Sequence, residues 1–218
     1  MNADAVARLV AGRLLQYPDE RLYADLDHLY EAAEHHPLLR EFIDHARAER
    51  PLGLAAHYTE VFDTRNRRCL YLTWWTDGDT RNRGLSLVRV KQVYREHGLE
   101  FTSEELPDFL PVLLEFAAHE EAAGTELLEE HRAGLELLRL AVTDFGTPYA
   151  RVLEAVCGTL PGPSPTTKAE AKALARSGPP RETVGLEPFG PGIDLPWPTV
   201  PAASTTSAVP AAPERTPA

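Results

Sequence analysis

Apolar residues recur every three or four positions through most of the first 158 residues, which is the spacing of amphipathic helices. Proline marks several boundaries between these periodic segments. No regular alternation of apolar and polar residues accompanies them, so paired strands are not expected. The pattern predicts helices over residues 2–16, 19–35, 37–50, 51–62, 79–97, 109–121, from 125 through 142, and 147–158. The predicted fold class is therefore all-α, a single helical bundle domain.

One apolar stretch, CLYLTWW at residues 69–75, fits either a strand or a buried helix, because periodicity cannot decide for so short a run. The elements around it are easier to delimit. Asp79 and Asp108 each precede a periodic segment and are predicted to be N-caps, whose side chains accept a hydrogen bond from the first helical turn. In the helix after Asp79, four residues are expected to face the core: Leu85, Val88, Val93 and Tyr94.

The composition changes in residues 159–218, which hold thirteen of the 19 prolines. We therefore predict a helical domain over 1–158, followed by an extended and largely disordered tail, because a Pro/Ala-rich chain buries too little apolar surface to order itself. One short helix is predicted over 166–177, where a Thr-Lys-Ala-Glu capping box occurs. An apolar extended segment is predicted over 183–200.

The formal net charge is −11, and all of it falls in residues 1–158, because the tail has five basic and five acidic residues. An acidic body repels nucleic-acid phosphates and attracts a basic polypeptide, although the same charge also serves simple solubility. No apolar run approaches the roughly 20 residues that span a bilayer, and the N-terminus lacks the pattern of a secretory signal. We expect a cytoplasmic protein that binds no nucleic acid and does not insert into a membrane.

The sequence contains no recognised motif for catalysis. It has no P-loop, no Gly-x-Gly-x-x-Gly and no nucleophile signature around serine or cysteine. Eight histidines are present, but pairs such as Glu115 and His119 do not extend to a complete ligand set. We predict no catalytic residue, no metal site and no stably bound cofactor. A helical-bundle enzyme or metal carrier, and a generic helical adaptor, remain the alternatives.

Two segments are unusual for a plain bundle. LTWWTDGDTRNRG, at residues 72–84, sets two tryptophans beside a polar turn, and EELPDFLPVLLEF, at 104–116, sets acidic residues before an apolar helix. Adjacent residues on a helix point about 100° apart. Trp74 and Trp75 therefore cannot both be buried on one narrow face, and we expect one of them at a surface groove.

These segments belong to a longer set of motifs. In chain order the motifs are LLQYPDERLYADL, HYTEVFDTRNRRCLYLTWWTDGDTRNRG, LVRVKQVYREHGLE and ELPDFLPVLLEFAA, and together they cover roughly residues 14–120. In order and spacing the sequence resembles the nitrate reductase molybdenum cofactor assembly chaperones, the NarJ type within the TorD-like family of redox-enzyme chaperones. The long second motif is the specific one.

The resemblance implies an all-α cytoplasmic chaperone of the TorD-like type, without catalysis. Its expected partner is the catalytic (alpha) subunit of a respiratory nitrate reductase, bound through the N-terminal segment of that subunit. The chaperone would support insertion of the molybdenum cofactor, which it would handle only through its client. A monomer is expected.

The family's motifs also imply which residues contact the client. Its Tyr-x-x-x-Phe pattern falls on Tyr58 and Phe62, and this chain has Asp77 and Phe109 where the family often has histidine. The predicted client-binding residues are Tyr58, Phe62, Tyr71, Trp74, Trp75, Asp79, Arg81, Glu105 and Asp108. An amphipathic helix of the client would lie in an apolar groove lined by the tryptophans, while acidic rims meet its basic side chains.

Overall fold

The computed structural model describes residues 2–64, 66–101 and 105–177. The described residues all belong to one compact unit, and residues 178–218, with the predicted apolar segment 183–200, lie outside the described residues. Within the described residues the structure contains helices and one isolated β-bridge, with no strand. The all-α prediction is confirmed.

Several helices begin where the sequence supplies a cap or a proline. The α-helices are α1 (Ala3–Leu14), α2 (Glu20–Ala32), α3 (Pro37–Ala48), α4 (Pro51–Tyr58), α5 (Leu72–Asp77), α6 (Arg81–Glu96), α7 (Leu110–His119), α8 (Glu121–Glu130), α9 (Arg132–Phe145), α10 (Tyr149–Gly158) and α11 (Lys168–Ser177). A π-helical turn, η1 (Thr59–Asp63), and a 3-10 turn, η2 (Asn66–Arg68), lie between α4 and α5. The side chain of Asn2 accepts from the Ala5 amide at 2.8 Å, and that of Asp19 accepts from the Leu22 amide at 2.9 Å. Proline stands in the first turn of α3, α4 and α7, where its missing N–H costs nothing.

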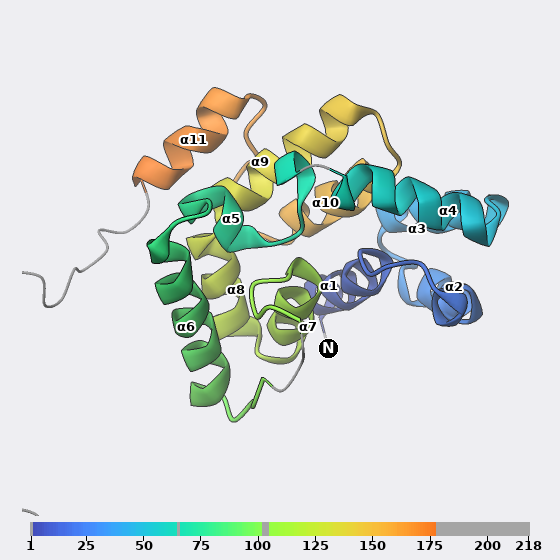
Figure 1. Ribbon diagram of the computed structural model, residues 1–218. Coiled ribbons are helices and arrows are strands. Elements are labelled where there is room, and N and C mark those ends of the chain that lie inside the picture. Colours follow the sequence, from blue (N-terminus) through green and yellow to red (C-terminus); the bar gives the residue numbers. More distant parts are fainter. Residues whose placement is uncertain (1, 65, 102–104, 178–218) are drawn as a thin grey trace, which may run out of the picture. The chain divides into compact units, whose positions relative to one another are not determined.

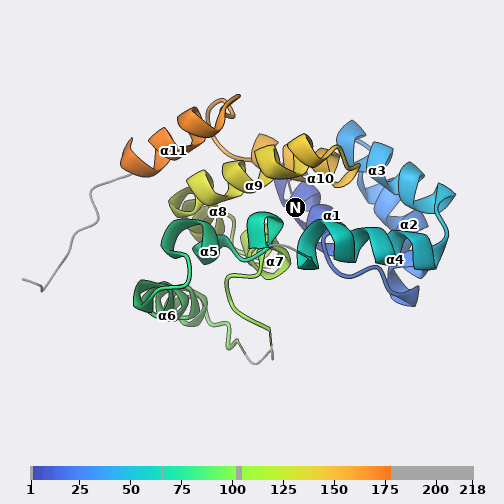
Figure 2. The ribbon, with the colours of Figure 1, turned by 45° about the horizontal axis from the view of Figure 1, so that its top comes forward.

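Two helices organise the packing. Helix α1 packs against α2, α3, α7 and α10, and helix α9 packs against α5, α8, α10 and α11. In both views α5 and α11 lie beside α9, and α1 lies beside α7 (Figures 1 and 2). The core holds large side chains from five helices, each less than 2% exposed: Leu14, Leu22, Phe42, Leu113 and Tyr149. Helix α11 thus extends the bundle through its contact with α9.

The helix predicted from residue 125 through 142 is wrong, because two helices, α8 and α9, meet there at His131. Each of these helices has a glycine pressed against a different neighbour. A Cβ atom on Gly124 would lie 2.2 Å from Cα of Ala117 in α7, and one on Gly134 would lie 2.8 Å from Cβ of Trp75 in α5. The two helices are thus packed against different neighbours on either side of His131.

The start and the inner face of α6 also differ from expectation. Asp79 is not its N-cap, because Thr80 holds that position in extended backbone and makes no side-chain cap bond. Leu85 and Val88 are 69% and 61% exposed rather than buried. Tyr94 is buried as expected, and so is Val90. At about 100° per residue, Leu85 and Val88 point roughly 140° and 160° away from Val90.

A buried arginine ties four segments together. Arg8 of α1 is 2% exposed and donates to the Ala117 carbonyl at 3.0 Å, to the Thr125 hydroxyl at 2.9 Å and to both the hydroxyl and the carbonyl of Thr159. Desolvation by burial lowers the pKa of the Arg8 guanidinium. Hydrogen bonds to neutral oxygens satisfy this charge, so α1, α7, α8 and the end of α10 are held in register.

Candidate functional site

The ambiguous stretch around residues 69–75 contains both a bridge and a helix. Tyr71 forms an isolated antiparallel bridge with Phe109, in which the Leu72 amide donates to the Asp108 carbonyl at 3.1 Å and the Leu110 amide donates to the Leu70 carbonyl at 2.8 Å. Helix α5, with both tryptophans, starts directly after the bridge. The two unusual sequence segments are therefore joined by backbone hydrogen bonds.

The sequence suggested that Asp108 caps α7, but in the structure its side chain caps the first turn of α5. The N-cap position of α7 is Phe109, with no side-chain cap bond. The Asp108 carboxylate is fully buried, and its Oδ2 accepts from the amide and the hydroxyl of Thr73 at 3.1 and 2.5 Å. An Arg83 guanidinium nitrogen lies 3.8 Å from the same oxygen. The bridge causes this exchange, because it sets Asp108 beside the N-terminus of α5.

The two tryptophans have different surroundings, although both are half-buried. Trp75 packs against the hydrophobic core, and its Nε1 donates to the Cys69 carbonyl at 3.1 Å. Trp74 lies under the guanidinium of Arg83, whose carbon is 5.7 Å from a ring centroid. Trp75 is thus the inner tryptophan and Trp74 the outer one.

Several predicted residues line one small cavity, which we call the aromatic pocket. Its volume is about 270 Å³. The lining residues are Tyr17, Tyr58, Phe62, Asp63, Cys69, Leu70, Tyr71, Glu105 and Phe109. Four of them, Tyr58, Phe62, Tyr71 and Glu105, were predicted from the sequence. They come from the end of α4, the turn η1, the bridge and the segment before α7, so the pocket lies where these chain segments converge.

The π-helical turn η1 supplies two walls of the aromatic pocket. The Thr64 amide donates to the Thr59 carbonyl at 3.1 Å, five residues back, which widens the helix after Tyr58. Such turns are rare and occur often at functional sites. The extra residue sets Tyr58, Phe62 and Asp63 around one space. Sequence reasoning missed Asp63, because a π turn has no periodic signature.

The pocket combines neutral hydroxyl groups with carboxylates. The Tyr71 hydroxyl donates to Glu105 Oε1 at 2.8 Å, and the Tyr58 hydroxyl donates to the Leu15 carbonyl at 3.1 Å. Burial raises the pKa of both tyrosines, and for Tyr71 the nearby Glu105 carboxylate raises it further. Burial also raises the pKa of the Asp63 carboxyl. At neutral pH the tyrosines therefore remain protonated donors.

The other predicted residues do not line this pocket. Asp79 and Arg81 are exposed at the turn between α5 and α6. Trp74 is beside them in sequence, and Asp108 is buried under α5. Any effect of Asp108 on a bound partner therefore passes through α5 or Arg83. The client-binding role of all nine residues stays a prediction.

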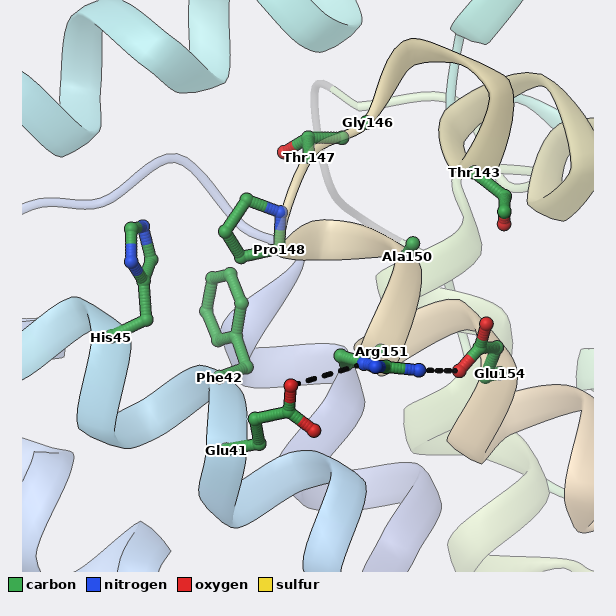
Figure 3. Close-up of a pocket in the computed structure, with 10 residues that line it drawn as sticks. All are labelled: Glu41, Phe42, His45, Thr143, Gly146, Thr147, Pro148, Ala150, Arg151 and Glu154. Atoms are coloured by element: carbon green, nitrogen blue, oxygen red, sulfur yellow. Dashed lines mark hydrogen bonds and ion pairs between the residues drawn. The ribbon is translucent and has the colours of Figure 1, made fainter.

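A larger cavity of about 410 Å³ lies between α3 and the connection from α9 to α10 (Figure 3). None of the sequence-predicted residues lines it. Arg151 lies between two carboxylates, at 3.2 Å from Glu41 and 2.9 Å from Glu154 (Figure 3). The charged groups of this cavity thus pair with one another.

The described residues offer no group of three or more His, Cys, Asp or Glu side chains placed to hold a metal ion. In the same part of the chain, no helix is long and apolar enough to cross a bilayer.

A family model described as nitrate reductase delta subunit matches residues 26–154. The chain belongs to the nitrate reductase delta subunit family. This confirms the resemblance drawn from the sequence motifs. The matched range contains eight of the nine residues of the aromatic pocket and leaves Tyr17 and α11 outside.

Individual relatives of this family member include assembly chaperones. "Nitrate reductase-like protein NarX" of Mycobacterium tuberculosis (strain H37Rv) is 41% identical over 155 residues, which cover 68% of this chain and 23% of that protein. "Probable nitrate reductase molybdenum cofactor assembly chaperone NarJ" of Bacillus subtilis is 30% identical over 154 residues, covering 67% of this chain and 84% of that protein. "Nitrate reductase molybdenum cofactor assembly chaperone NarJ" of Escherichia coli K12 is 31% identical over 151 residues, covering 65% of this chain and 64% of that protein. The chain therefore spans about a quarter of the mycobacterial relative and most of the Bacillus one.

A crystal structure of a candidate redox enzyme maturation protein from Archaeoglobus fulgidus has the same fold. It aligns with a TM-score of 0.57 and 21% sequence identity, covering 72% of this chain and 93% of that one. At this identity the likeness concerns the fold alone.

Proposed function

We propose that this protein is a dedicated chaperone of nitrate reductase assembly. It binds the N-terminal segment of the catalytic (alpha) subunit and supports insertion of the molybdenum cofactor into that subunit. The observation that carries the proposal is membership of the delta subunit family, together with relatives named as molybdenum cofactor assembly chaperones. In this proposal the protein acts in the cytoplasm, as a monomer and without catalysis.

The arrangement around α5 is suited to holding a helical peptide. An amphipathic helix binds by placing apolar anchors in a groove, while charged rims guide its approach. The aromatic pocket offers Tyr58, Phe62 and Tyr71 as apolar walls. The outer Trp74 and the exposed Asp79 and Arg81 stand on the neighbouring α5–α6 segment. We assign these residues and Glu105 to client contact, and we assign Trp75 and Asp108 to holding α5 in place.

The molybdenum cofactor is cargo for the client in this account. We propose that the chaperone keeps the alpha subunit competent to receive the cofactor and does not itself bind the cofactor stably. The excess of negative charge in the helical domain favours a basic client segment over nucleic acid.

Calorimetry tests the binding step. The full chain is titrated with a peptide of the first 25 or so residues of the nitrate reductase alpha subunit from the same organism, and a scrambled peptide of equal composition is the control. We expect saturable binding of the native peptide alone, and Tyr71→Ala should weaken it by about tenfold, as for a central aromatic anchor. Equal binding of both peptides, or of neither, contradicts the proposal.

A further inference from the structure

We propose that the exposed side of helix α6 is a second docking surface, whose occupant is an acidic amphipathic helix of the alpha subunit. The inference rests on the proposed function, because it assigns a further segment of the same client. It goes beyond that function in naming a surface outside the aromatic pocket and a segment that differs in charge from the basic N-terminal one. We call this surface the α6 face, and it consists of Arg81, Leu85, Val88, Gln92 and Arg95.

The α6 face is a continuous stripe along one side of the helix. Its five residues are spaced by four, three, four and three positions, so at about 100° per residue they lie within about 80° of one another. All five are exposed. At 1.5 Å per residue, Arg81 and Arg95 are about 21 Å apart along the helix axis. The stripe therefore presents two aliphatic side chains between two cationic ends, over a length that suits a helix of about four turns.

The two aliphatic residues of the α6 face are exposed although the helix is firmly anchored. Leu85 and Val88 are 69% and 61% exposed, and at a spacing of three their side chains are neighbours on the helix surface. On the opposite side of α6, Val90 and Tyr94 are buried, and the Tyr94 hydroxyl donates to the Pro107 carbonyl at 2.8 Å. A partner that covers Leu85 and Val88 would gain from removing their apolar surface from water, without any rearrangement of α6.

The charge of α6 is opposite in sign to that of the domain that carries it. The helix has five basic residues and one acidic residue, Glu96, whereas the helical domain has a net charge of −11. Two of the basic residues lie beside carboxylates of the chain: Arg83 is 3.8 Å from Asp108, and Arg89 pairs with Glu130 of α8. Arginines at both ends of the α6 face favour carboxylates on the occupant, because complementary charges set the register and speed the encounter of two surfaces.

Other occupants of a basic face are opposed by the same charges. An anionic bilayer or a nucleic acid would be repelled by the net charge of −11 on the helical domain, and two aliphatic residues supply little apolar area for insertion into lipid. A second copy of this chain, bound α6 to α6, would bring arginines against arginines. An acidic amphipathic helix instead matches both the aliphatic pair and the cationic ends of the α6 face.

The α6 face adjoins the residues that we assign to client contact. Helix α6 lies beside α5 in both views, and the two are joined by the turn at Gly78 (Figures 1 and 2). Arg81 belongs to both sets, and the Arg83 guanidinium carbon lies 5.7 Å from a ring centroid of the outer Trp74. A client held at α5 can therefore bring a second segment to α6. A basic N-terminal segment would be repelled there, so the occupant is a different part of the alpha subunit.

The test measures how the alpha subunit binds this chain after the site for its N-terminal peptide has been saturated. The full chain is immobilised, free N-terminal peptide is added in excess, and binding of the cofactor-free alpha subunit is followed by interferometry. Residual binding should remain with the wild type, Leu85→Glu should weaken it by about tenfold, and higher salt should weaken it as well. Leu52→Glu is the matched control, because Leu52 is an 83% exposed leucine of α4, outside the α6 face, and it should leave the residual binding unchanged.

A photo-crosslinker at position 92 identifies the occupant. The alpha-subunit segment that it links, found by mass spectrometry, should be acidic and lie outside the N-terminal segment. Linkage to the N-terminal segment, equal residual binding by wild type and Leu85→Glu, or no residual binding overturns the α6 face and leaves the proposed function standing. Binding to phosphatidylglycerol vesicles that Leu85→Glu abolishes would assign the face to a bilayer instead. A wild-type chain that binds neither the N-terminal peptide nor the alpha subunit overturns both proposals.

Discussion

Asp108 holds the start of α5 in place, a role that its position in the sequence does not indicate. Its buried carboxylate satisfies two donors of Thr73 at the start of α5 and faces Arg83. Sequence reasoning identified Asp108 as a cap but chose the helix that follows it in the chain. The correct helix is α5, which only the bridge between Tyr71 and Phe109 brings close. Long-range pairing of this kind leaves no local signal in the sequence.

Replacing Asp108 by alanine should lower the free energy of unfolding by about 1–3 kcal/mol, because Thr73 then keeps buried donors without an acceptor. Asp79→Ala is the control, since Asp79 is exposed and caps no helix, and it should stay within about 0.5 kcal/mol of wild type. Urea denaturation of the three proteins measures both values. Equal losses for the two variants would show that Asp108 has no special role in holding α5.

Replacing each tryptophan by alanine should have a different effect, one mainly on stability and the other mainly on peptide binding. Trp75→Ala removes core packing and a hydrogen bond, so the free energy of unfolding should fall by about 3 kcal/mol, the low end for a truncated buried aromatic because Trp75 is half-buried. Trp74→Ala should lower the free energy of unfolding by about 1 kcal/mol or less, while it weakens binding of the alpha-subunit peptide. Denaturation and calorimetry on the same preparations check this. A larger stability loss for Trp74→Ala would reverse the inner and outer assignment.

At the scale of elements, prolines and N-caps predicted most helices well, because those signals act within one turn. Helices α1 and α2 begin directly after Asn2 and Asp19, and helices α3 and α4 begin at Pro37 and Pro51. The π turn after Tyr58 and the break between α8 and α9 were missed. Neither feature has a local periodic signature, and after the break Gly134 of α9 packs against Trp75 of α5, 59 residues earlier in the chain. Of the residues that line the pocket, the sequence motifs identified four. The other five required the fold: Tyr17, Asp63, Cys69, Leu70 and Phe109.

Two glycines in helices make an internal test of this packing argument. Gly124→Ala should destabilise the protein by about 1–3 kcal/mol or more, because its Cβ would lie 2.2 Å from backbone of Ala117 and α8 would have to move. Gly84→Ala in exposed α6 meets nothing within 4 Å and should stabilise by about 0.5–1 kcal/mol through helix propensity. Thermal unfolding distinguishes them by sign. A neutral Gly124→Ala would mean that α8 and α7 are not so closely packed.

For the whole molecule, the net charge and the lining of the aromatic pocket both fit a basic partner. The helical domain carries the entire net charge of −11, and the aromatic pocket adds two carboxylates to apolar walls. Helix α11 lies outside the family's matched range, yet it joins the bundle through α9, and Lys168 at its start pairs with Asp144 at 2.6 Å. The matched range contains all nine residues that the sequence predicted for client contact, and α11 lies outside it.

In the proposed function, this protein enables molybdenum cofactor insertion into nitrate reductase. The most direct measurement is the molybdenum content, by plasma mass spectrometry, of an alpha subunit purified from cells that lack their own assembly chaperones. The alpha subunit is expressed with wild-type protein, with a Tyr71→Ala/Glu105→Gln variant, or alone. We predict near-stoichiometric molybdenum with wild type and a several-fold lower content in the other two cases. Equal molybdenum in all three preparations would contradict the account.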